Sequence, residues 1–111
     1  MKKRIEKTGD LIIVHLEGEM TDQSFHQLGR DLLVLIADGP RLMALDFEDV
    51  NQMDLAALGQ LIGFSRHLIL QETDLILYGL KSSFIDLMSI SGTDKLFNIL
   101  TLEQFEALYR K

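Results

Sequence analysis

Two acidic segments, 17–22 and 46–54, gather carboxylates that could serve as metal ligands or as acid and base groups. If the apolar runs before them form parallel neighbouring strands, the carboxylates meet at the carboxyl edge of a sheet, where open α/β sheets bind ligands. Oxygen ligands suit Mg²⁺, but no fixed ligand spacing is present. The alternative is a solvated acidic rim in which Asp54 caps a helix, so we expect neither a metal site nor a cofactor. The carboxylates are Glu17, Glu19, Asp22, Asp46, Glu48, Asp49 and Asp54.

Residues for nucleophilic catalysis are not arranged together in this sequence. There is no cysteine, and His15, His26 and His67 are scattered, with no serine placed as a nucleophile beside them. We therefore expect no enzymatic activity. Ser82 and Ser83 could bind an anion or nucleotide at a helix N-terminus, although the simpler interpretation is that one of them caps that helix.

Apolar periodicity divides the chain into strands that alternate with helices. We expect strands at 4–7, 11–16 (ending at Gly18), 42–47 and 75–78, with a short extra strand at 97–100. We expect helices from Thr21 or Asp22 to about 37, from 55 to 72, from Ser82 or Ser83 to Gly92, and from 102 to 109. Strands separated by helices need crossover connections. The predicted fold is α/β, with a mixed, mostly parallel sheet of four to five strands and about four helices.

Length and charge narrow the classes of function. The chain has 111 residues, the size of one domain, which we assign to 1–111. Its net charge of −6 repels nucleic acids and anionic membrane surfaces, so neither is an expected partner. No apolar run approaches the roughly 20 residues that span a bilayer, and no leader pattern follows the basic N-terminus. We expect a cytoplasmic protein.

The expected helix at 55–72 has two contrasting faces. One is apolar and should face the core: Leu58, Leu61, Ile62, Ser65, Leu68 and Ile69. The opposite face is made of small or uncharged residues: Ala56, Gly59, Gln60, Gly63 and His67. Such a face allows a partner to approach closely, and its low charge is typical of interface centres. The alternative is that the glycines let the helix pack near a loop or helix of the same domain. Met53, just before the helix, is expected to fill the core; the alternative is that it forms part of a docking patch with Leu55.

The order of elements and several segments resemble the STAS domain family, which includes bacterial anti-sigma factor antagonists. The most specific segment is 45–59 (LDFEDVNQMDLAALG), similar to the family's pattern of a strand ending in Asp, a variable loop, and Asp-Ser-[Ser/Thr]-Gly-Leu-Gly. The segments 16–20 (LEGEM) and 90–97 (ISGTDKLF) support it. The resemblance covers nearly the whole chain.

This resemblance implies a non-catalytic domain that regulates another protein through the loop and helix around 49–63. The partner would be an anti-sigma factor, a switch kinase or a transporter component, and a homodimer is a further option. Counting from Asp54, the family's phosphorylated hydroxyl residue falls on Ala56, so the usual phosphate switch is expected to be missing. The alternative function is a module that senses a small molecule, anion or nucleotide. The residues expected to bind the partner are Asp54, Leu55, Ala56, Ala57, Gly59, Gln60, Gly63 and His67.

Overall fold

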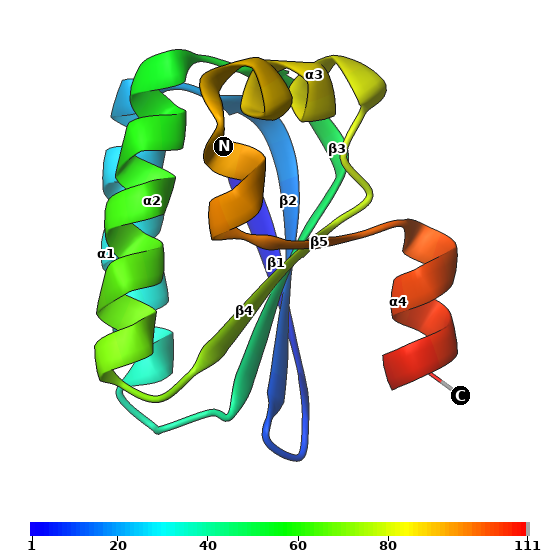
Figure 1. The fold of residues 1–111 in the computed structure, drawn as a ribbon. Coiled ribbons are helices and arrows are strands. Elements are labelled where there is room, and N and C mark those ends of the chain that lie inside the picture. Colours follow the sequence, from blue (N-terminus) through cyan, green and yellow to red (C-terminus); the bar gives the residue numbers. More distant parts are fainter. Residues whose placement is uncertain (111) are drawn as a thin grey trace.

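The computed structural model describes residues 1–110, in which five strands form one mixed sheet with helices on both faces (Figure 1). The strands stand in chain order, β1 pairs antiparallel with β2, and the other neighbours are parallel. The α/β prediction is confirmed. Lys111, the last residue of the expected domain, lies outside the described residues. The strands are β1 (Lys2–Thr8), β2 (Leu11–Met20), β3 (Leu42–Met53), β4 (Asp74–Tyr78) and β5 (Asn98–Leu100).

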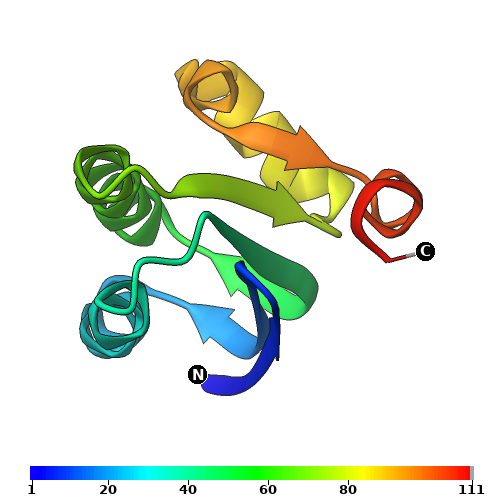
Figure 2. The same cartoon turned by 90° about the horizontal axis from the view of Figure 1, so that it is seen from below.

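The helices divide between the two faces of the sheet (Figure 2). Right-handed crossovers that move steadily across a sheet place their helices on one face, and α1, α2 and α3 share that face. The last helix, α4, follows the edge strand and packs on the other face. None of the helices in residues 1–110 has the length and apolar content needed to cross a bilayer. The helices are α1 (Asp22–Ile36), α2 (Leu55–Leu70), α3 (Ser82–Ser91), the 3₁₀ helix η1 (Thr93–Leu96) and α4 (Leu102–Tyr109).

Each face of the sheet has its own apolar core. The larger core lies under α1, α2 and α3 and includes Leu32, Phe47, Leu61 and Met88. The smaller core lies under α4, where the ring of Phe105 stacks on the ring of Tyr78 with centroids 3.9 Å apart. The smaller core covers only part of its face, so polar side chains of β1, β2 and β3 remain partly open to solvent there.

Two strands extend well past their predicted carboxyl ends. β2 continues past Gly18 to Met20, and β3 continues from Phe47 to Met53. Gly18 adopts a φ of +113° beside two shifts in the pairing register, so it bends the strand instead of ending it. The segment 49–53, expected as a loop, is therefore a paired strand that delivers the chain to the start of α2.

Candidate partner-binding surface

The start of α2 is held in place by Asp54. Its carboxylate accepts a hydrogen bond from the backbone N–H of Ala57 at 2.7 Å, as a helix N-cap does. Its own N–H donates to the carbonyl of Met20 at the end of β2, at 3.1 Å. Met53, immediately before it, is buried in the larger core, as expected. The cap and the buried side chain fix the first turn of α2 at the carboxyl edge of the sheet.

The predicted partner-binding residues come together on the outer side of α2, with one exception. Ala57 has no exposed surface, so that prediction is wrong: position 57 points into the core because the sheet lies directly beneath it. Leu55 is 63% exposed, an unusual degree for a large apolar side chain at a helix start. The remaining residues define what we call the α2 surface: Asp54, Leu55, Ala56, Gly59, Gln60, Gly63 and His67.

The buried stripe of α2 is rotated from the predicted one. Ile69 was expected in the core but is 72% exposed, and Ile62 and Ser65 are only half-buried. Phe64 is buried instead, with its ring 6.4 Å from the ring of Phe25 on α1 in an edge-to-face arrangement. The reason is that α1 packs alongside α2 and covers the Phe64 side, a neighbour that the periodicity of α2 alone does not reveal.

The two glycines of the α2 surface leave open space. A Cβ atom built on Gly59 or Gly63 would meet no atom within 4 Å among the described residues. Neither glycine is therefore required for close packing inside the domain, which was the alternative interpretation. Glycine inside a helix costs about 1 kcal/mol relative to alanine, and the fold gives no compensating contact at either site.

The acidic rim predicted at the carboxyl edge of the sheet forms only in part. β2 and β3 are parallel neighbours, and Glu17 pairs with Asp49 in register at the sheet's carboxyl end. Asp46, however, is only 5% exposed, because its carboxylate lies 2.6 Å from His15 Nδ1 and accepts the backbone N–H of Glu48. Within residues 1–110, no group of acidic or histidine side chains is arranged to hold a metal ion.

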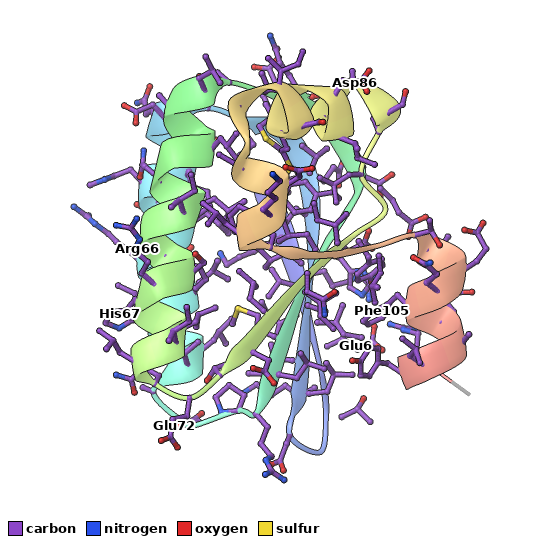
Figure 3. The ribbon with its side chains drawn as sticks, in the orientation of Figure 1. Glu6, Arg66, His67, Glu72, Asp86 and Phe105 are labelled. Carbon is purple, nitrogen blue, oxygen red and sulfur yellow. The ribbon has the colours of Figure 1, made fainter. Side chains whose placement is uncertain are left out.

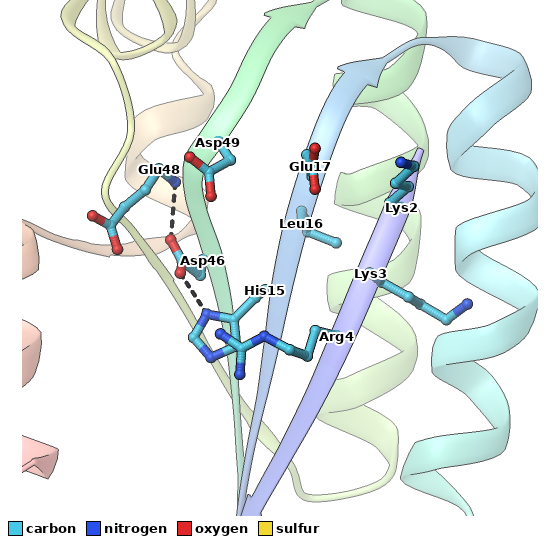
Figure 4. Close-up of a pocket in the computed structure, with 9 residues that line it drawn as sticks. All are labelled: Lys2, Lys3, Arg4, His15, Leu16, Glu17, Asp46, Glu48 and Asp49. Carbon is cyan, nitrogen blue, oxygen red and sulfur yellow. Dashed lines mark hydrogen bonds and ion pairs between the residues drawn. The ribbon is translucent and has the colours of Figure 1, made fainter.

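A polar network that the sequence did not predict lies on the α4 face of the sheet, and Figure 4 shows its His15 and Asp46 side chains. His15 places Nδ1 beside Asp46 and Nε2 2.9 Å from the carboxylate of Glu6. Arg110 donates to the same Glu6 oxygen at 2.6 Å. These hydrogen bonds lower the pKa of the Glu6 carboxyl, with His15 the larger cause. His15 lies on β2, an inner strand between β1 and β3.

His15 and Asp46 of this network also line an open cavity of about 450 Å³ (Figure 4). Lys2 and Arg4 of β1 stand on one wall, and Glu17 and Asp49 on the other. The cavity lies on the opposite face of the sheet from α2, so it is separate from the α2 surface.

Ser82 and Ser83 open α3, as predicted, but neither of them is its N-cap residue. Lys81 occupies that position, and it makes no side-chain hydrogen bond to the helix. Both serines are exposed. Binding of an anion there stays a prediction.

A family model describes the chain along almost its whole length. The model of the STAS domain matches residues 2–106. The chain belongs to the STAS domain family.

Solved structures of other STAS-like proteins share the fold at low sequence identity. An anti-sigma factor antagonist from Mycobacterium paratuberculosis gives a TM-score of 0.82 at 18% identity, covering 99% of this chain and 94% of that one. A Ser-to-Glu variant of RsbS from Moorella thermoacetica gives 0.76 at 24% identity, covering all of both chains. A sulfate transporter family protein from Wolinella succinogenes gives 0.77 at 15% identity, covering 91% and 85%. No curated protein sequence matches this STAS domain significantly.

Ala56 stands at the position where the STAS family pattern predicts a hydroxyl residue. It is exposed in the first turn of α2, two residues after the capping Asp54. Its side chain is a methyl group, and the whole segment 49–63 contains no serine, threonine or tyrosine. The segment therefore offers no hydroxyl group to a kinase.

Proposed function

We propose that this STAS domain is a non-catalytic interaction module that regulates a partner protein through the α2 surface and the adjoining end of β3. The partner is an anti-sigma factor, a switch kinase or a transporter component. Family membership and the similarity in fold to an anti-sigma factor antagonist and a sulfate transporter family protein support these partner classes.

The observation that carries the proposal is the exposed, low-charge ridge of α2. Leu55, Ala56, Gly59 and Gly63 follow one another along its outer side with no part of the described chain above the two glycines. Interface centres are depleted of charged residues and pack closely. A row of small and apolar residues along the exposed side of a helix is suited to contact with another protein.

We propose that phosphorylation within segment 49–63 does not regulate this domain, because the segment has no hydroxyl side chain. The positive end of the α2 dipole would stabilise a phosphate on the first turn, but Ala56 has no oxygen to accept one. Binding through the α2 surface is then constitutive, or is controlled by a change elsewhere in the chain or in the partner.

Substitution of Ala56 by arginine tests the α2 surface. Ala56→Arg places a long charged side chain on an exposed position, so the domain should fold normally while affinity for the partner falls by at least about tenfold, or 1.4 kcal/mol. Gly63→Glu should act in the same direction. The partner is first captured from the native cell with the wild-type domain and identified by mass spectrometry, and affinity is then measured by calorimetry.

Ala107→Arg is the matched control, because Ala107 is also an exposed helical alanine but lies on α4, on the other face of the sheet. It should bind the partner as the wild type does. Normal binding by both Ala56→Arg and Gly63→Glu would place the interface elsewhere and contradict the proposal.

A further inference from the structure

A groove runs between α1 and α2, which lie side by side and point in the same direction (Figures 1 and 2). Its volume is about 290 Å³, and its floor is formed by the buried rings of Phe25 and Phe64. Gly29 on α1 and Gly63 on α2 flank it, so its walls are low on both sides. We call this feature the α1–α2 groove. Only its α2 wall overlaps the α2 surface.

The residues that line the α1–α2 groove include one permanent positive charge, that of Arg30, and no carboxylate, in a protein whose net charge is −6. Arg30 is exposed and, within residues 1–110, has no carboxylate within 4 Å; it donates instead to Nε2 of His26 at 3.2 Å. His67 stands on the opposite rim and projects outward from α2 (Figure 3). Asp22 lies at one end of the groove, where the side-chain amide of Gln60 donates to its carboxylate and to its carbonyl. The rim complements an acidic partner.

The shape of the groove favours a helix over an extended segment. Its lining on α1 extends from Phe25 to Leu33, roughly 12 Å or two helical turns. The backbone groups of α1 and α2 are used within those helices, so an extended chain on the apolar floor would leave its own N–H and C=O groups without partners. A helix satisfies its backbone internally, and it packs closely where glycines lower the walls.

We infer that the α1–α2 groove receives an acidic amphipathic helix of the partner protein. In this mode of recognition, the helix lays its apolar face into a hydrophobic groove. An apolar side chain of that helix lies over Phe25 and Phe64, and a carboxylate lies beside Arg30. This inference rests on the proposed function and specifies the chemistry of its partner.

A pair of synthetic peptides tests the inference without the natural partner. The first is a fluorescein-labelled helix of about four turns, with leucines along one face and glutamates beside them; its twin carries lysines in place of the glutamates. Fluorescence anisotropy should show binding of the glutamate peptide and at least about tenfold weaker binding of the lysine twin. Added salt should reduce the difference, because the charges concerned are exposed. No binding of the glutamate peptide, or equal binding of the twins, would overturn the inference.

Two variants test whether the peptides bind in the α1–α2 groove. Arg30→Glu should reverse the preference between the two peptides, and Gly63→Leu should weaken both by filling the open space over the floor. Lys7→Glu, an equal change of charge on the exposed end of β1, should leave both affinities unchanged. Circular dichroism confirms that each variant is folded. Retention of wild-type binding and preference by both Arg30→Glu and Gly63→Leu would show that the peptide binds elsewhere.

The natural partner separates this inference from the proposed function. Arg30 lies on α1, outside the α2 surface. Loss of the partner by Ala56→Arg but not by Arg30→Glu would keep the proposed function and refute the groove. Loss by Arg30→Glu but not by Ala56→Arg would support the groove and show that the partner does not contact the first turn of α2. A wild-type homodimer in light scattering that Arg30→Glu dissociates would make a second copy of this chain the occupant and overturn the inference.

Discussion

At the scale of single residues, a network of side-chain hydrogen bonds connects separate elements on the α4 face of the sheet. His15, Glu6 and Arg110 join β1, β2 and the residue that follows α4, and Asp46 extends the network to β3. These residues are far apart in the sequence, so their association could not be predicted from spacing. By contrast, the capping role of Asp54 is a local signal, because the carboxylate and the amide it accepts belong to one turn.

Two carboxyls on this face have opposite pKa shifts. Burial raises the pKa of Glu48, and the neighbouring carboxylate of Asp46 raises it further. Hydrogen bonds from His15 and Arg110 lower the pKa of Glu6. Ionised Glu48 therefore destabilises the fold at a pH above its folded pKa, whereas ionised Glu6 stabilises the fold above the usual pKa of a glutamate.

We predict that Glu48→Gln raises the melting temperature at pH 7. The increase should shrink as the pH falls below the raised pKa of Glu48, and disappear below the usual pKa of a glutamate, where the carboxyl is neutral in both the folded and the unfolded state. Calorimetric melting at pH 7 and in acid measures the effect. Glu6→Gln is the paired control with the opposite sign: it should lower the melting temperature at pH 7, with the loss shrinking as the pH falls through the lowered pKa of Glu6. A Glu48→Gln increase of equal size at both pH values would contradict this explanation.

At the scale of elements, local signals predicted helices better than strands. The bounds of α4 match the prediction because Thr101 caps its start, and Gly92 ends α3 with a φ of +75°. β2 and β3 were predicted too short because Gly18 and the polar residues near Asp49 do not look like a strand in isolation. Their strand state comes from pairing between β2 and β3, a long-range contact that single-sequence patterns do not contain.

Substitution of the two α2 glycines by alanine should stabilise the domain. We predict that Gly59→Ala and Gly63→Ala each raise the free energy of unfolding by about 1 kcal/mol, because each position is helical and has room for a Cβ atom. Chemical denaturation measures it. Gly92→Ala should destabilise instead, since Gly92 has a positive φ. A loss of stability in both α2 variants would mean that the glycines serve the fold rather than a partner.

At the scale of the whole molecule, the sheet separates two regions. On one side, α2 presents an exposed ridge beside the α1–α2 groove; on the other, α4 and the His15 network cover part of the sheet. The exposed ridge was predicted from the composition of α2. The groove was not, because it depends on the pairing of Phe25 with Phe64 and on the packing of α1 against α2. Changes at the α2 surface should accordingly leave the His15 side unaffected.

The most direct test of the α2 surface is hydrogen exchange of the complex between the unmodified domain and its captured partner. Mass spectrometry of peptides from the free and bound domain locates the backbone amides that become protected. We predict slower exchange in segment 54–67 and no change in α4, in a domain whose intact mass shows no added phosphate. Protection confined to α4 or to the sheet face of His15, with α2 unchanged, would contradict the account.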